Sequence, residues 1–103
     1  MEVIFNSKKI EDLYVTGKST KLKLDKKVVY SFFEVVAILE AAINIYDLWK
    51  QPSLNFEKLI NTENRYSVRL DRKWRLELTI DWQDEKMIVG IIGIEDITNH
   101  YGG

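Results

Sequence analysis

A stretch of alternating residues from Arg65 to Trp82 most constrains what this chain can fold into. A period of two residues is typical of a β-strand, in which successive side chains point to opposite faces of the sheet. Polar residues at 71–73 interrupt the alternation, so the stretch predicts a β-hairpin with a short connection. One face is expected to build core, and the other to carry polar groups. The core set is Tyr66, Val68, Leu70, Trp74, Leu76, Leu78, Ile80 and Trp82, and the polar set is Arg65, Ser67, Arg69, Arg75, Glu77, Thr79 and Asp81.

The hairpin also concentrates positive charge. The chain holds 15 Lys and Arg against 16 Asp and Glu, yet residues 65–75 contain five basic residues and one acid. Guanidinium groups keep their charge and offer paired donors that match phosphate oxygens, so this face favours a phosphodiester ligand. The alternative is structural, because cross-strand Arg–Glu pairs and solvated edge charges are a common fate of such residues. Sequence alone leaves both interpretations open.

Composition narrows the class of protein. A chain of 103 residues, 46% hydrophobic and 30% charged, predicts one ordinary globular domain with one core. With no Cys and a single His, a metal site is not expected, and the glycines form no phosphate loop for a nucleotide cofactor. The amino terminus resembles no signal peptide, and the apolar segment 28–43 is too short to span a bilayer. We therefore expect a cytoplasmic protein without cofactor, metal or membrane association.

The amino-terminal half predicts a strand and two helices. Residues 3–5 are β-prone, Ser7 can cap a short helix, and Gly17 can end it. A lysine-rich connection leads to Asp25, which can cap a long helix whose apolar stripe is broad enough to be buried over most of its circumference. Apolar character continues as far as Pro52, which is expected to end this element. An open apolar groove beside the long helix would suit a partner segment.

The carboxy-terminal half completes the sheet. Residues 51–64 predict an irregular connection, and an acidic turn at 83–86 follows the hairpin. A third strand at 87–94 is apolar on both faces, so we expect it inside the sheet. The whole order predicts one small α+β domain, residues 1–103, in which an N-terminal strand and two helices pack on an antiparallel sheet with a C-terminal three-strand meander.

Cleavage of RNA is one chemistry that these residues can serve. The 2′-hydroxyl of the substrate is the nucleophile, so a site needs a proton acceptor, cations around the phosphate and a donor to the leaving oxygen. Arginines on the sheet, the pair His100 and Tyr101, and one charged loop residue can meet that need. The alternative is that His100, the single histidine near the end of the chain, is exposed and has no functional role.

The hairpin and two flanking motifs together resemble a known family. The segment YSVRLDRKWRLEL at 66–78 is similar to the core signature of HigB-type toxins in the RelE/ParE superfamily. In that signature a Tyr-Ser-x-Arg strand leads through a polar turn to Trp-Arg and an apolar strand. The NHY sequence at 99–101 looks like the His-Tyr terminus of the ribonuclease branch, and FEKL at 56–59 is similar to the loop before the hairpin. The order of elements agrees over nearly the full length.

The resemblance implies a RelE/ParE-like fold and the toxin of a bacterial type II toxin–antitoxin system. Its activity would be that of a ribosome-dependent, metal-independent endoribonuclease, or mRNA interferase, that cuts translated mRNA in the ribosomal A site. Its protein partner would be a HigA-like helix-turn-helix antitoxin, and operator DNA would be contacted only through the antitoxin complex. Because this chain carries a formal net charge of −1, RNA binding would depend on a local patch.

The resemblance also assigns roles to residues. Arg75 would stabilise the charge of the transition state, Arg69 would contact phosphate, and His100 or Tyr101 would handle a proton. His100 is favoured for acid–base work because the usual pKa of histidine lies nearest neutrality. Glu57 is a candidate general base, with Lys58 as the alternative. The residues expected to bind RNA are Arg65, Arg72, Lys73, Lys58 and Asn99.

Two rival functions stay open. A ParE-like toxin that poisons gyrase would need no catalytic His-Tyr ending, so the presence of His100 and Tyr101 argues against it. A noncatalytic module would use the arginine hairpin to dock protein or nucleic acid, with a passive tail.

Overall fold

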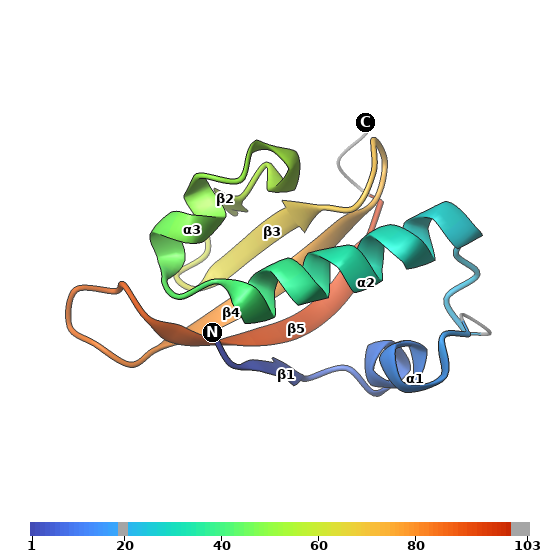
Figure 1. Cartoon of the computed structure of the whole chain (residues 1–103), viewed down its shortest axis with the longest axis horizontal. Helices are drawn as coiled ribbons and strands as arrows, with labels where there is room; N and C mark the ends of the chain where they lie inside the picture. Colours follow the sequence, from blue (N-terminus) through green and yellow to red (C-terminus); the bar gives the residue numbers. More distant parts are fainter. Residues whose placement is uncertain (19–20, 100–103) are drawn as a thin grey trace.

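Five strands form one mixed sheet in the order β1-β5-β4-β3-β2, and the long helix α2 lies across one of its faces (Figure 1). The computed structural model describes residues 1–18 and 21–99. The elements are β1 (Val3–Phe5), α1 (Lys8–Thr16), α2 (Lys26–Ala41), α3 (Ile45–Trp49), the 3₁₀ helix η1 (Pro52–Leu54), β2 (Glu57–Lys58), β3 (Arg65–Arg69), β4 (Arg75–Trp82) and β5 (Gly90–Thr98). The expected α+β class is confirmed.

The meander expected from the hairpin is present as β3, β4 and β5. Both pairings are antiparallel, with Val68 opposite Leu76 in the first and Ile80 opposite Ile92 in the second. The sheet is mixed, because β1 joins β5 in parallel, with Ile4 opposite Gly93. Strand β5 therefore lies inside the sheet between β1 and β4, as its apolar character predicted.

Local capping explains where the two first helices begin and end. The Ser7 side chain accepts from the backbone N–H of Ile10, and Gly17, at a φ of 71°, ends α1. The Asp25 side chain accepts from the N–H of Val28 at 3.0 Å and starts α2. All three positions agree with the sequence prediction. The core joins the inner face of α2 to the sheet, and its fully buried members include Val28, Phe32, Leu39, Leu76, Leu78, Ile80, Ile92 and Ile94.

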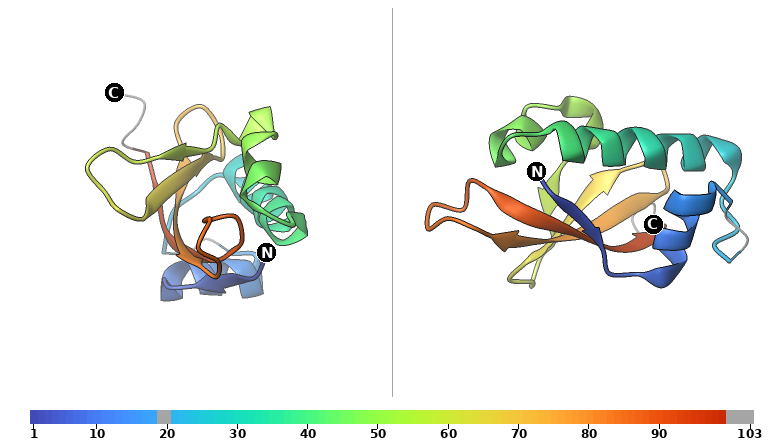
Figure 2. Two further views of the ribbon diagram at one scale, coloured as in Figure 1. Left: turned by 90° about the vertical axis from the view of Figure 1, so that its left-hand side faces the viewer. Right: turned by 60° about the horizontal axis from the view of Figure 1, so that its bottom comes forward.

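The apolar run after the long helix does not continue that helix. Helix α2 ends at Ala41, and the Asn44 side chain accepts from the N–H groups of Tyr46 and Asp47 to start α3. The expectation of one element as far as Pro52 was wrong, because this cap begins a second short helix in a new direction. Figure 2 shows α2 and α3 together on the same side of the sheet.

The strands differ from the expectation in three places, and the first is that β5 runs on to Thr98 instead of ending at residue 94. Strand β5 starts at Gly90 instead of residue 87, because the Asp84 carboxylate accepts from the N–H groups of Ile88 and Val89 and holds them in the loop. The connection at 51–64 contains the short strand β2, which pairs antiparallel with β3 through Glu57 opposite Ser67. Among the described residues, no helix is both long and apolar enough to cross a membrane.

Candidate functional site

The polar face of the hairpin is partly covered rather than open to solvent. Ser67 is fully buried, and the Arg75 side chain is only 7% exposed, although the alternation placed both with the polar groups. The covering comes from residues 55–57, which follow η1 and pass beside β3. The prediction of two distinct faces holds, but Asn55 and Glu57 of this segment contact the Arg75 guanidinium on the polar face.

Among the residues that the structure describes, Ser67, Asn55 and Glu57 contact the Arg75 guanidinium, and we call this group the Arg75 cradle. Its Nε–H donates to Ser67 Oγ at 2.9 Å, and its Nη2 donates to the carbonyl oxygens of Asn55 at 2.7 Å and Ser67 at 3.3 Å. The same Nη2 lies 3.6 Å from Glu57 Oε1. A guanidinium is planar, so contacts on two of its nitrogens fix the direction in which it lies. The cradle therefore holds a buried cation in one orientation.

Glu57 forms the solvent side of the cradle. It lies on β2, and its side chain is 46% exposed while its Oε1 contacts the buried arginine. Lys58, its neighbour on β2, is exposed. The structure thus brings Glu57, but not Lys58, into contact with Arg75 in the part of the chain that it describes.

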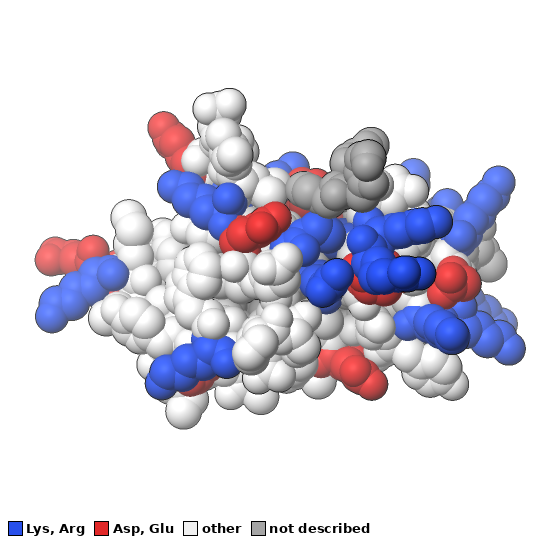
Figure 3. All heavy atoms as spheres, turned by 90° about the horizontal axis from the view of Figure 1, so that it is seen from above, with Lys and Arg blue, Asp and Glu red and all other residues white. Residues whose placement is uncertain are grey.

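Three basic residues lie together at the connection between β3 and β4. Arg69, Arg72 and Lys73 are all exposed, and Arg69 is the cross-strand partner of Arg75. The Asp71 carboxylate shapes the turn by accepting from the N–H groups of Lys73 at 2.8 Å and Trp74 at 2.7 Å. Seen from above, basic side chains outnumber acidic ones over the end of the molecule that holds this turn and the start of α2 (Figure 3).

Arg65 lies apart from this group, at the other end of β3. Arg65 lies four residue steps along the strand from Arg69, which is about 13 Å. Its guanidinium lies 3.5 Å from a Glu77 carboxylate oxygen and 3.6 Å from one of Glu95. Glu95 also accepts from the Thr79 hydroxyl at 2.8 Å. Arg65 therefore follows the structural alternative, in which arginines on a sheet pair with acids on neighbouring strands.

The expected proton donors lie outside the described residues. This holds for both His100 and Tyr101. The structure does place the end of β5, since Thr98 is the cross-strand partner of Arg75 and Asn99 follows it, exposed. The last described residues therefore leave the sheet beside the cradle.

Sequence reasoning missed Ser67 and Asn55. A signal existed for Ser67, because a small hydroxyl residue alternates with Arg65 and Arg69 on a strand face otherwise made of long charged side chains. Asn55 carries a φ of 43°, and asparagine tolerates such positive values better than most residues. Its role depends on its carbonyl oxygen, which no side-chain pattern reveals. In residues 1–18 and 21–99, we find no group of three or more side chains arranged to hold a metal ion.

The small α+β domain with its five-strand mixed sheet matches the fold of solved YoeB and YoeB/ParE toxin structures. The chain is similar to the YoeB dimer from Staphylococcus aureus, with a TM-score of 0.57 and 23% identity over 98% of both chains. It is also similar to a YoeB/ParE toxin from Agrobacterium tumefaciens, with a TM-score of 0.57 and 11% identity over 98% of this chain and 100% of that one. No protein-family model matches the sequence, and no curated protein matches it.

Proposed function

We propose that this chain is the toxin of a bacterial type II toxin–antitoxin system and acts as a ribosome-dependent, metal-independent endoribonuclease. Two kinds of observation support the proposal. The fold is that of proteins described as YoeB and YoeB/ParE toxins. The hairpin sequence at 66–78 and the NHY sequence at 99–101 resemble HigB-type toxins, and we assign the chain to that type on those motifs.

The observation that carries the proposal is the Arg75 cradle. A half-exposed carboxylate, Glu57, lies 3.6 Å from a buried, oriented guanidinium at the point where β5 ends. A cation fixed before the reaction can stabilise negative charge as it builds on a phosphate, without the cost of reorienting during the step. A carboxylate beside it can accept a proton from a hydroxyl of the same substrate. Glu57 and Arg75 thus supply the proton acceptor and a cation for the phosphate, and RNA cleavage needs one further group, a proton donor to the leaving oxygen.

The proposed reaction uses Arg75, Glu57 and one proton donor. Glu57 accepts the proton of the 2′-hydroxyl, the 2′-oxygen bonds to the adjacent phosphorus, and the bond from phosphorus to the 5′-oxygen breaks. The leaving oxygen takes a proton from His100 or Tyr101. In the sequence, His100 and Tyr101 follow shortly after Thr98, which is the cross-strand partner of Arg75. The products are a 2′,3′-cyclic phosphate and a 5′-hydroxyl.

In this proposal RNA is bound by exposed cations near the cradle and by the exposed amide of Asn99. Arg69 contacts the phosphate at the cut, while Arg72, Lys73, Lys58 and Asn99 contact the flanking backbone. The substrate is mRNA in the ribosomal A site. The protein partner is a HigA-like helix-turn-helix antitoxin, and operator DNA is reached only through the complex with it.

One observation favours a second candidate function. The Arg75 side chain is 7% exposed and donates to three protein oxygens, which is also what a purely structural arginine does. A noncatalytic docking module, or a ParE-like toxin that poisons gyrase, would use the exposed Arg69, Arg72 and Lys73 and leave Arg75 as a support.

Brief induction in bacteria, followed by primer extension on mRNA, separates the candidates. We compare the parent with Arg75→Ala, Glu57→Gln and His100→Ala, and use Lys86→Ala in the loop before β5 as the matched surface control. Cuts within translated codons that vanish in the three variants and in cells with blocked ribosomes, but persist in Lys86→Ala, support the ribonuclease. Growth arrest with intact mRNA would contradict it and support gyrase poisoning or docking.

A further inference from the structure

A row of aromatic rings lies behind the segment that covers Arg75. The ring centroids of Trp49, on α3, and Phe56 lie 4.5 Å apart, edge to face at 62°. Phe56 in turn stacks on Tyr66 of β3, with centroids 5.4 Å apart and ring planes at 13°. Aromatic pairs at such spacings stabilise one another beyond the area that they bury. The ring row, Trp49, Phe56 and Tyr66, therefore joins α3 to β3 through residue 56.

Phe56 stands between the two residues that this segment contributes to the Arg75 cradle. Asn55 directs its carbonyl oxygen at the guanidinium, and Glu57 directs its carboxylate there. Tyr66 lies on the core face of the hairpin, whereas the Arg75 side chain lies on the polar face. The segment is therefore held from one face by the guanidinium and from the other by the rings.

The backbone of this segment has few anchors in the described structure. Strand β2 has two residues, and it pairs only with β3 because it lies at the edge of the sheet. Asn55, just before it, adopts a φ of 43°, which costs free energy for a residue other than glycine. Within residues 55–57 the buried side chain is that of Phe56. The path of the segment therefore depends on how Phe56 packs.

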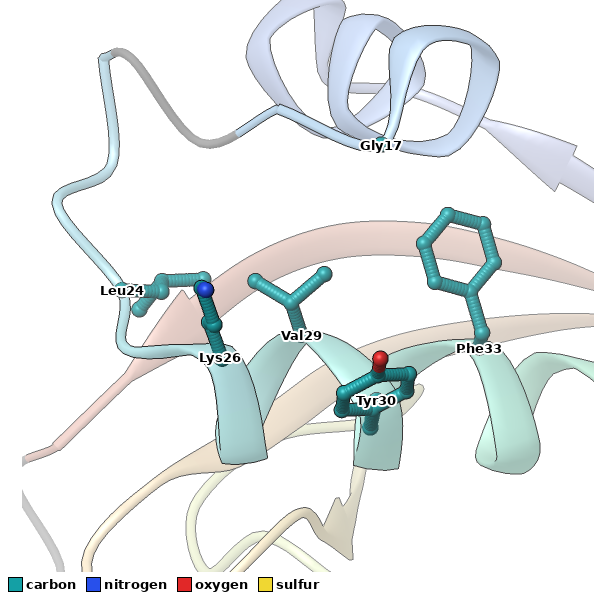
Figure 4. Close-up of a pocket in the computed structure, with 6 residues that line it drawn as sticks. All are labelled: Gly17, Leu24, Lys26, Val29, Tyr30 and Phe33. Atoms are coloured by element: carbon teal, nitrogen blue, oxygen red, sulfur yellow. The ribbon is translucent and has the colours of Figure 1, made fainter.

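Trp49 covers the outer side of Phe56. The helices do not cover the core evenly, and between the end of α1 and the first turns of α2 they leave a groove of about 360 Å³. Figure 4 shows Val29 and Phe33 projecting toward Gly17 in that groove. Over Phe56, by contrast, the Trp49 ring lies in contact, and Phe56 is only 6% exposed. Trp49 itself is 52% exposed, so it covers the core without forming its interior.

We propose that Trp49 is a positioning residue for the Arg75 cradle. Its ring holds Phe56 in place, and Phe56 keeps the Asn55 carbonyl and the Glu57 carboxylate at the guanidinium. A misplacement of about 1 Å in a reacting group can cost about 10²-fold in rate, even when the altered residue lies far from the chemistry. The catalytic consequence rests on the proposed ribonuclease function, whereas the effect on the cradle does not.

Hydrogen exchange of the Arg75 Nε–H measures the cradle directly, without any substrate. This N–H donates to the Ser67 hydroxyl and is buried, so it should exchange slowly in the parent. Its signal in ¹H–¹⁵N spectra is assigned by its absence in Arg75→Lys. We expect Trp49→Ala to speed the exchange by about three- to tenfold, which corresponds to the loss of one aromatic pair.

Helix α3 also offers a matched control. Tyr46 lies on the same helix, is 53% exposed, and packs against no other ring among the residues that the structure describes. Tyr46→Ala should leave the exchange unchanged, and Trp49→Phe, which keeps a ring, should retain most of the protection. A thermal melt establishes that each variant is folded. Trp49→Leu, which keeps an apolar contact without a ring, takes the place of Trp49→Ala if alanine unfolds the chain.

Cleavage kinetics supply a readout that a merely structural role would not change. With a defined mRNA on ribosomes, Trp49→Ala should lower kcat by about ten- to a hundredfold, while KM changes by less than about threefold. Tyr46→Ala and Trp49→Phe should stay near the parent values. If the folded parent cuts no RNA, the ribonuclease proposal fails, and the exchange measurement still decides the positioning role of Trp49.

Three results would overturn the proposal. The first is an unchanged Nε–H exchange rate in folded Trp49→Ala, or in Trp49→Leu where alanine unfolds the chain. The second is equal acceleration in Tyr46→Ala, which would indicate a general loosening of α3. The third is a raised KM with kcat unchanged in Trp49→Ala, which would assign Trp49 to substrate binding instead.

Discussion

Replacing Ser67 with alanine tests whether the Arg75 cradle is a built site rather than a chance contact. Ser67 is fully buried, and its hydroxyl accepts from Arg75 Nε at 2.9 Å. A hydrogen bond to a charged group contributes about 1.5–3 kcal/mol, and a buried donor left without its partner costs a similar amount. We therefore expect Ser67→Ala to lower the free energy of unfolding by about 2 kcal/mol.

This loss converts into a measurable change in melting temperature. An unfolding entropy of about 2.1 cal/mol/K per residue gives roughly 0.2 kcal/mol/K for a chain of this length, so Tm should fall by about 9 °C. Differential scanning calorimetry and urea unfolding provide two independent measurements. Ser53→Ala is the matched control, because Ser53 is exposed and its hydroxyl accepts from the exposed Gln51 Nε2, and it should change stability by less than about 0.5 kcal/mol.

A double-mutant cycle attributes the loss to Arg75. In an Arg75→Met background the donor is gone, so Ser67→Ala should cost less than about 0.5 kcal/mol. The reasoning is refuted if Ser67→Ala costs as little as Ser53→Ala in the parent, or if its cost is the same with and without Arg75.

Two further predictions concern the sheet and the loop before β5. Gly93→Ala should lower the free energy of unfolding by about 1–3 kcal/mol in urea titrations, because a Cβ there would lie 2.5 Å from Asn6 Nδ2 and 2.6 Å from Thr79 Oγ1; unchanged stability would contradict this packing. The pKa of Asp84 lies below its usual 3.8, chiefly because its carboxylate accepts from the Val89 N–H. A lowered pKa in the folded state stabilises the protein above the unfolded pKa, and this contribution is lost as pH falls through the folded pKa. Asp84→Ala should therefore be less stable than the parent near pH 6, with a gap that narrows below about pH 3.8 in pH-dependent melts; a gap that widens at low pH would contradict it.

Local signals in the sequence predicted most of the elements. The period of two residues located β3 and β4, and Ser7, Gly17 and Asp25 marked the ends of helices where the structure has them. The parallel pairing of β1 with β5 was not predictable in this way, because it joins residues about 90 positions apart that share no local pattern. Register between distant strands depends on the packing of the whole domain.

The two charged members of the candidate site were predictable, but Ser67, Asn55 and the burial of Arg75 were not. The hairpin pattern and the family resemblance pointed to Arg75, and Glu57 was already a candidate. That Arg75 is buried follows from residues 55–57 passing beside β3, with the Asn55 carbonyl directed at the guanidinium. Such a contact depends on the path of an irregular segment, and composition gave no signal of that path. Arg65 lies 3.5 Å from Glu77, and cross-strand pairing of arginine with glutamate was already the open structural alternative for this face.

The most direct test of the central proposal is cleavage of a defined mRNA on purified ribosomes, with a single 2′-deoxynucleotide placed at the cut position. If the 2′-hydroxyl is the nucleophile, the all-ribose mRNA should be cut to a 2′,3′-cyclic phosphate and a 5′-hydroxyl, and the substituted mRNA should stay intact at that position. Glu57→Gln should reduce the rate on the all-ribose mRNA by roughly 10²- to 10⁴-fold, the usual contribution of a general base. Cutting of the deoxy-substituted mRNA, or no cutting of either mRNA by the folded parent, would contradict the account.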